Sequence, residues 1–167
     1  GQDAPPALYR IEVTVGPGSG VRILNSPAPP AFRESVSYGE QNLYKRSKAL
    51  VGDREPRGHE FSIQMRAMDP ERSGQGLGLP VLVALCGSLI ERSSKGGLVI
   101  VGALNLGGSV EMIPNPVGVA ELAIEKGATT LLMPISARRQ LFDLPDDLAT
   151  RINVEFYADV TDAFAKA

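Results

Sequence analysis

Side chains that commonly act as nucleophiles, bases or metal ligands are scarce in this chain of 167 residues. His59 is the only histidine and Cys86 is the only cysteine. A Ser-His-Asp triad would have to use His59, and no motif in the sequence places a nucleophile near it. Cys86 lies in an apolar stretch, so we interpret it as a small buried hydrophobe.

Acidic side chains offer no better basis for a metal site. The pairs Asp146-Asp147 and Asp69/Glu71 lack the spacing of metal ligands, and one histidine with one cysteine forms no cluster. We therefore predict neither a metal nor a bound cofactor in this chain. His59 is expected at the start of a strand.

Two glycine-rich segments, GPGSG at residues 16–20 and GQGLG at residues 74–78, could hold a ligand or only form turns. Neither matches a phosphate-binding loop, which needs a lysine and a hydroxyl after its last glycine. We interpret them as turn glycines or points of close backbone packing. The second segment leads into an apolar helix, which is a suitable place for Ser-Lys catalysis. That chemistry needs an exposed serine hydroxyl, a lysine that accepts its proton, and helix N–H groups for the oxyanion.

The elements that must position these segments follow from hydrophobic periodicity. Apolar patterns predict six strands, at residues 8–15, 21–24, 59–66, 98–101, 130–133 and 152–157. Helices are predicted at residues 34–51, 80–91, 117–126, 136–142 and 160–166. The expected helix caps are Gly127, Ser136, and Asp159 or Thr161. This alternation predicts a mixed α/β fold in which small sheets pack with helices.

Four segments carry more specific expectations. The first two strands are expected to pair with each other as a hairpin, and residues 104–113 are expected to form a tight hairpin around Gly107-Gly108. The helix at residues 80–91 is apolar nearly all round, so it should be central. The strand at residues 98–101 should be buried.

The composition, 43% hydrophobic and 22% charged, fits one globular domain. A net charge of -2 with both signs mixed argues against strong nucleic-acid binding by this domain alone. No apolar run approaches the roughly 18 residues of a membrane span, and the lone cysteine favours the cytoplasm. Because the sequence opens with Gly1 rather than Met, we expect a fragment of a longer protein, with Gly1 foreign to it. We expect a hairpin and proline-rich connector at residues 1–30 and the main part at residues 31–167.

Several segments, in their order along the chain, resemble the C-terminal proteolytic domain of Lon proteases. They are RESVSYGEQNLYKRSKAL, HEFSIQM, SGQGLGLPVLVALCGSL, VGALNLGGSVEMI, AELAIEKGATTLLMP, FDLPDD and VTDAFAKA. Together they cover about residues 30–167, and their joint order is more specific than any one of them. The resemblance implies the Lon proteolytic-domain fold, which belongs to a Ser-Lys endopeptidase.

The catalytic pair of that family is missing from the matching positions. Alignment on the flanking glycines places the family's serine at Gly76, and alignment of the later hairpin places its lysine at Val117. Glycine supplies no nucleophile and valine accepts no proton, and members of such a pair act as a unit. Ser73 with Lys126 or Lys95 could form a displaced pair. We interpret Ser73 as a loop hydroxyl and Lys126 as a solvated residue at a helix end.

A narrower resemblance connects VGPGSGVRILNSPAPPAF and GGLVIVGALNLGGSVEMIPNPVGVAELAIEKGATTLLMPISARRQL with the C-terminal part of the BrxL family. These are the Lon-like AAA+ ATPases of bacterial BREX phage defence. The resemblance implies an ATPase part with ATP and Mg²⁺ outside this chain, assembly into a ring, a hexamer or larger, and contacts with other BREX components. It also implies action on DNA through the full-length protein.

We therefore expect a catalytically degenerate Lon-like domain that serves as an oligomerisation scaffold and is not itself an enzyme. The alternative is an ATP-dependent Lon-type peptidase domain with a displaced Ser-Lys dyad.

Overall fold

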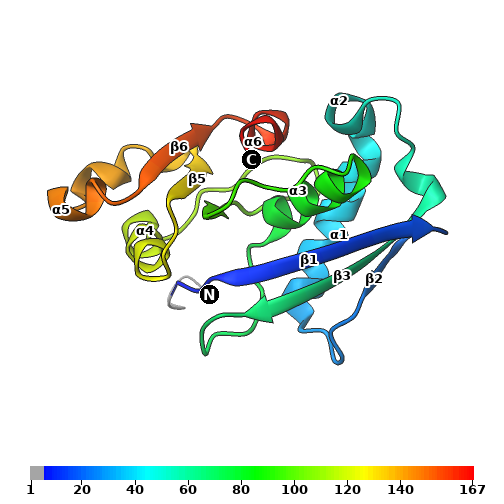
Figure 1. The fold of residues 1–167 in the computed structure, drawn as a ribbon, viewed down its shortest axis with the longest axis horizontal. Helices are drawn as coiled ribbons and strands as arrows, with labels where there is room; N and C mark the ends of the chain where they lie inside the picture. The colour runs from blue at the N-terminus through cyan, green and yellow to red at the C-terminus, as the bar shows by residue number, and fades with distance from the viewer. Residues whose placement is uncertain (1–5) are drawn as a thin grey trace.

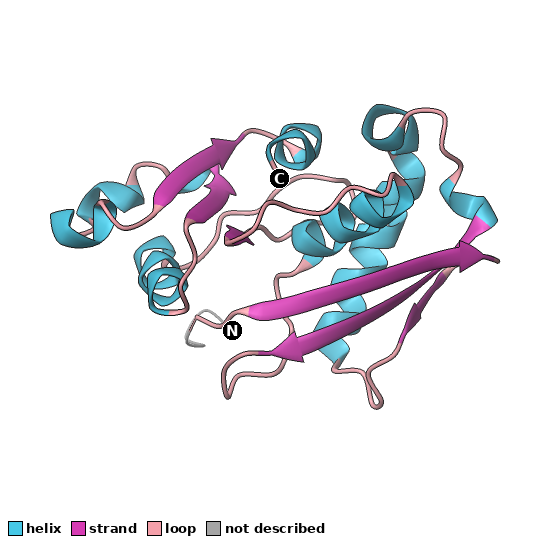
Figure 2. Ribbon diagram, viewed as in Figure 1, coloured by secondary structure: helices cyan, strands magenta, loops and turns pink. Residues whose placement is uncertain are grey.

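The fold consists of two three-stranded sheets with helices packed against both. A computed structural model describes residues 6–167, and the expectation about Gly1 falls on residues outside this range. Figure 2 shows that the strands form two groups separated by central helices. The expected mixed α/β class, small sheets packed with helices, is confirmed.

The first sheet contains β1 (Tyr9–Pro17), β3 (His59–Ala67) and β2 (Val21–Ile23), in that spatial order. β1 runs antiparallel and β2 parallel to β3, so the expected hairpin between the first two strands is wrong. β3 has the most deeply buried inward side chains of the sheet, because it is the central strand. The loop before β2 therefore crosses the end of β3, where the Phe61 N–H donates to the Gly20 carbonyl at 2.9 Å.

The helix expected at residues 34–51 is in fact two helices, α1 (Pro30–Lys45) and α2 (Ser47–Val51). It begins earlier than expected because a proline in the first turn lacks only an N–H that the helix does not need. It is interrupted at Arg46, whose guanidinium donates to the Gly107 carbonyl at 2.9 Å on a distant loop. The helix is thus interrupted at the same residue that makes this long-range contact.

Helix α3 (Gly78–Leu89) is the central helix, as its apolar sequence predicts. Its ends lie two residues before those expected, and Pro80 lies in its first turn. It packs against α1 and β1, and Figure 1 shows both helices on the same side of the first sheet. A short 3-10 turn, η1 (Pro56–Gly58), leads from α2 to β3.

The second sheet contains β4 (Leu98–Ile100), β5 (Thr130–Pro134) and β6 (Asn153–Tyr157), all parallel. β4 is half-buried rather than buried, because it is an edge strand of this sheet. The hairpin expected at residues 104–113 is reduced to a single bridge, between Leu104 and Val110.

Helix α4 (Pro116–Glu125) covers one face of the second sheet. It is followed by Gly127 at φ +85°, so the expected glycine cap is confirmed. On β5, Leu131 and Met133 pack in the cluster that includes α4, whereas Leu132 packs in the cluster that includes α3. This alternation gives the sheet two apolar faces, each covered by a helix.

The helix expected at residues 136–142 is replaced by two 3-10 turns, η2 (Ile135–Ala137) and η3 (Gln140–Asp143). Ser136 is not a cap, because it lies inside η2, whose N-cap is Pro134. A short helix that the periodicity did not indicate, α5 (Asp146–Ala149), precedes β6.

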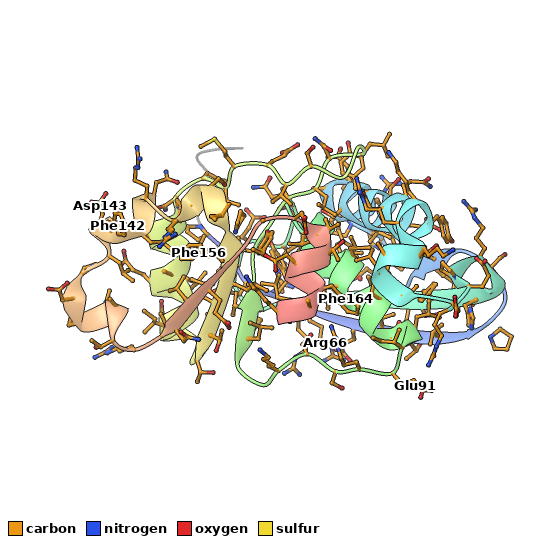
Figure 3. All side chains as sticks on the ribbon, turned by 90° about the horizontal axis from the view of Figure 1, so that it is seen from above. Arg66, Glu91, Phe142, Asp143, Phe156 and Phe164 are labelled. Carbon is orange, nitrogen blue, oxygen red and sulfur yellow. The ribbon has the colours of Figure 1, made fainter. Side chains whose placement is uncertain are left out.

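The final helix, α6 (Val160–Lys166), begins where the sequence predicts. The carboxylate of Asp159 accepts the Asp162 N–H at 2.8 Å, so Asp159 rather than Thr161 is the cap. Phe164 packs in the cluster of α3, and Figure 3 shows it on α6 near the centre of the molecule.

Two hydrophobic clusters result from this arrangement. The first joins the first sheet, α1, α3 and α6 with one face of the second sheet, and the second joins the other face with α4, η3 and α5. No helix within residues 6–167 is long and apolar enough to cross a membrane.

Candidate functional site

A cleft of about 1080 Å³ opens at the amino-terminal end of α3. Residues 68–78, which join β3 to α3, form one side of it and are called the loop wall. Residues 113–128, which include α4, contribute the opposite side and are called the α4 wall. α1, α3, β1, β4 and the loops on both sides of β4 complete the lining. Gly76, the position matched to the family's serine, lines this cleft.

Ser35 and Tyr9 fix the backbone of the loop wall. The Ser35 hydroxyl, which is buried on α1, donates to the Gly74 carbonyl at 3.3 Å and accepts the Leu77 N–H at 3.2 Å. The Tyr9 hydroxyl on β1 accepts the Gly74 N–H at 3.2 Å. The loop is thereby held from two elements that are distant in sequence, although sequence reasoning identified neither residue.

Gly74 and Gly76 both have left-handed backbone, at φ +68° and +69°, but their surroundings differ. A Cβ on Gly74 would lie 2.5 Å from the sulfur of Met65 and 2.9 Å from the Cβ of Phe32. A Cβ on Gly76 would meet no atom of the described chain within 4 Å. The interpretation of these glycines as turn and close-packing residues is confirmed, and Gly74 requires glycine for both reasons.

The position of Gly76 in the cleft suits a nucleophile, but glycine has no side chain that could react. It is exposed in the cleft and directly precedes Leu77, the N-cap of α3. A hydroxyl there would lie beside the first turn of α3, although the Leu79 N–H already donates to the Gly102 carbonyl at 3.2 Å and Pro80 has no N–H. Glycine leaves this corner of the cleft without a reacting group.

Val117 lies in the first turn of α4 and is half-buried in the second hydrophobic cluster. Among the described residues that line the cleft, α4 and its ends contribute Asn115, Val119 and Lys126. The structure therefore brings Gly76 to the cleft and directs Val117 towards apolar packing.

Asn115 is a cleft residue that sequence reasoning missed. It has left-handed backbone at φ +50°, which asparagine tolerates better than most residues, and its side chain accepts the Gly118 N–H at 3.0 Å. It thus caps α4 at the mouth of the cleft. An asparagine directly before Pro116 was the available signal for such a cap.

Ser73 and Lys126, two of the residues proposed for a displaced pair, are engaged in other contacts. Ser73 donates its N–H to the Glu71 carboxylate at 2.8 Å, and its hydroxyl accepts the Gln75 N–H at 3.4 Å. Lys126 is not simply solvated as expected, because its ammonium lies 3.0 Å from the Asp69 carboxylate. Lys95 lines the cleft and is exposed.

Backbone hydrogen bonds stabilise the charged forms of two carboxylates on the loop wall. The N–H of Leu8 lowers the pKa of Asp69, and Lys126 lowers it further. The N–H of Ser73 lowers the pKa of Glu71 in the same way. The loop wall therefore keeps two negative charges near neutral pH.

The remaining candidate nucleophile and base lie outside the cleft. Cys86 is buried in α3, and desolvation raises the pKa of its thiol to about 12, so its interpretation as a buried hydrophobe is confirmed. His59 begins β3, and its ring nitrogen Nδ1 lies 2.7 Å from the Glu55 carbonyl oxygen. Within residues 6–167, no three His, Cys, Asp or Glu side chains group as metal ligands would.

Comparison with known proteins gives the chain several relatives, although a scan against models of protein families finds no match. It is 28% identical over 165 residues to the Lon-like protease BrxL of Escherichia coli O9:H4 (strain HS), which covers 96% of this chain and 23% of that protein. It is 23% identical over 162 residues to the Lon-like protease BrxL of Bacillus cereus (strain H3081.97), covering 95% of this chain and 24% of that one. A Lon protease of Methylocella silvestris (strain DSM 15510 / CIP 108128 / LMG 27833 / NCIMB 13906 / BL2) is 25% identical over 158 residues, covering 94% of this chain and 20% of that protein.

These similarities confirm the resemblance inferred from the ordered segments. The resemblance concerns only part of these proteins, because the chain spans about a quarter of the length of the curated relatives it matches.

Proposed function

We propose that this chain, which is a Lon-like domain and more narrowly a BrxL-like one, is a non-catalytic module that supports assembly of a larger protein. A fold can persist without its chemistry, because the core that stabilises it and the groups that react are separate. This chain has a cleft and backbone tethers of its loop wall, while a serine and a lysine are absent from the matched positions.

Gly76 carries this proposal. It lies in the cleft directly before α3, at the position where the matching family segment has its serine. Losing one member of a nucleophile and base pair removes most of the rate that the pair supplies. The position matched to the family's lysine holds the half-buried Val117. Because Val117 belongs to a separate segment, the second member of the pair is missing independently of the first.

Exposed apolar side chains support a role in assembly. The most exposed are Phe142 on η3, at 78%, and Met112 before α4, at 74%. Figure 3 shows Phe142 at the outer margin of the molecule, beside Asp143. Contiguous exposed apolar patches mark contacts between proteins, and these two side chains are the first candidates for such a patch. We infer self-association into a ring of a BREX-type protein, with ATP and Mg²⁺ bound outside this chain and DNA reached through the whole protein.

A degradation assay tests the absence of catalysis. The 167-residue chain, and a longer protein that contains it supplied with ATP and Mg²⁺, are incubated with casein beside an active Lon protease. We expect no cleavage above the buffer control. Cleavage that disappears in Ser73→Ala would overturn the proposal, because it would identify a displaced nucleophile.

The alternative is a peptidase with a displaced dyad, which the names of the relatives favour. It would need Ser73 to exchange its present hydrogen bonds and Lys126 to leave Asp69. Lys126→Met distinguishes the two functions. It abolishes cleavage in a displaced-dyad enzyme and leaves a scaffold's casein result unchanged.

Sedimentation velocity tests the assembly role. We expect concentration-dependent association of the longer protein that weakens with Phe142→Ser, whose native side chain is almost fully exposed. A strictly monomeric longer protein would contradict the scaffold function. In a parallel measurement, the isolated chain should show little salt-dependent affinity for DNA, because its net charge is -2.

A further inference from the structure

We propose that the ion pair between Lys126 and Asp69 is a clasp that holds the α4 wall against the loop wall and keeps the cleft narrow. The Lys126 ammonium lies 3.0 Å from Oδ1 of Asp69 and also donates to the Met68 carbonyl at 3.3 Å. The other oxygen, Oδ2, accepts the Leu8 N–H at 2.9 Å. One carboxylate thus connects the start of β1, the end of β3 and the end of α4.

The clasp joins segments that do not share a hydrophobic cluster. The apolar side chains of α4 belong to the second cluster, whereas Leu77 and the apolar side chains of α3 belong to the first. Leu8, Met68 and Lys126 all line the cleft, so the bridge lies at its margin. Because the two clusters meet only through the second sheet, which lies between them, the polar bridge fixes the end of α4 against the loop wall.

The clasp is also more protected than an ordinary surface ion pair. The Lys126 and Asp69 side chains are 30% and 14% exposed, against 64% and 49% for Arg66 and Glu12 on the open face of the first sheet. Partly buried charges are screened less by salt and interact more strongly. The third ion pair among residues 6–167, Lys166 with Asp162, lies within α6 and connects it only to the preceding strand β6, through the Phe156 carbonyl.

The consequence is control of access to the cleft. With the clasp formed, α4 is held towards the loop that carries Gly76, and with the clasp broken the cleft widens. This behaviour does not depend on whether the cleft catalyses a reaction, because it follows from the connection between the two walls.

Lys126→Met tests the clasp, and Lys166→Met is its matched control. Each native ammonium binds one carboxylate and one backbone carbonyl, but Lys166 contacts only Asp162 and Phe156, within its own part of the chain. The exposed residues Arg72, on the loop wall, and Glu121, on the α4 wall, are replaced by cysteines that carry spin labels. Double electron–electron resonance then measures the distance between the two walls. The buried, protonated thiol of Cys86 escapes labelling.

We expect one narrow distance distribution in the parent chain. In Lys126→Met the distribution should broaden to longer distances, with an open fraction about tenfold larger, as the loss of a charged hydrogen bond implies. Lys166→Met should resemble the parent, and Lys126→Arg should restore the narrow distribution. An unchanged distribution in Lys126→Met, or equal broadening in Lys166→Met, would overturn the clasp.

A salt titration of the labelled parent chain provides a test that does not depend on the folding of any charge variant. Only molar NaCl should broaden the distance distribution, because the pair is protected from solvent in part and is screened less than an exposed pair. If the distribution stays constant up to high salt while circular dichroism shows the fold intact, the clasp is not what sets the spacing.

Discussion

The loop wall of the cleft is fixed by hydrogen bonds to its own backbone, whereas the α4 wall is fixed mainly by apolar packing. Ser35 and Tyr9 hold the loop at Gly74 and Leu77. On the opposite side, Val117 and its neighbours pack into the second hydrophobic cluster. Gly76, the position matched to the family's serine, therefore lies in a segment held by these hydrogen bonds, whereas Val117, the position matched to its lysine, packs against a hydrophobic cluster.

The largest expected effect comes from the glycines of the loop wall. Gly74→Ala combines an unfavourable left-handed backbone with overlap on Met65 and Phe32, so we expect about 3 kcal/mol of destabilisation. Gly76→Ala has the same backbone strain but open space, so about 1 kcal/mol is expected. Urea unfolding of both variants measures the difference. Equal losses would show that close packing does not fix this wall.

The next effect comes from the tether on α1. Ser35→Ala leaves the Gly74 carbonyl and the Leu77 N–H without this partner in a buried place, so we expect a loss of about 2 kcal/mol. Ser88→Ala is the control, because its half-buried hydroxyl donates only to the Leu85 carbonyl one turn earlier. The measurement is again urea unfolding. If Ser35→Ala is no more damaging than Ser88→Ala, the tether does not stabilise the loop wall.

The α4 wall should respond at its cap. Asn115→Ala removes the hydrogen bond to Gly118 and forces alanine into left-handed backbone. We expect the free energy of unfolding to fall by about 1 kcal/mol. Asn115→Gly loses the same hydrogen bond but relieves the backbone, so only a few tenths of a kcal/mol are expected. Thermal unfolding compares the two. A larger loss for glycine than for alanine would mean that the left-handed backbone at this position is unimportant.

The smallest expected effect is a pH dependence of stability, which comes from Asp69 in the ion pair that connects the two walls. The folded state lowers the pKa of Asp69, so its ionised form contributes stability above the unfolded pKa of about 3.9. This contribution is lost as pH falls through the lower folded value. Asp69→Asn should therefore flatten the acid side of the stability profile by less than about 1 kcal/mol.

The matched control for this pH dependence is Glu12→Gln, which breaks the exposed pair with Arg66. Urea midpoints measured from neutral pH down to acid should flatten more in Asp69→Asn than in this control. Identical profiles would remove Asp69 from the coupling of the two walls.

Most elements were predictable because they rest on local patterns. The alternation in β1 and β3, the apolar run of α3 and the glycine after α4 all have local causes, and the structure confirms them. The hairpin between β1 and β2 was mispredicted because strand order is a choice between partners that are distant in sequence. The break of the first long helix at Arg46 was missed for the same reason, since Arg46 contacts Gly107.

The candidate site was predictable only where whole segments match a family. Gly76 was identified in that way, and the structure places it in the cleft. Ser35 and Tyr9 could not be found, because their partners lie 42 and 65 residues away and isolated hydroxyls carry no motif. The pairing of Lys126 with Asp69 was missed because it depends on how the two clusters meet.

The insertion of β3 between β1 and β2 constrains the order in which the chain can fold. β1 pairs along its whole length with a strand that is synthesised much later, from Pro17 with His59 to Tyr9 with Ala67. The amino-terminal strands must therefore wait, with their apolar faces uncovered, until β3 and the helix before it are present. Contacts of such long sequence separation slow folding. During synthesis neither β1 nor β2 can pair in this sheet until β3 has emerged, and the cleft beside the sheet can form only afterwards.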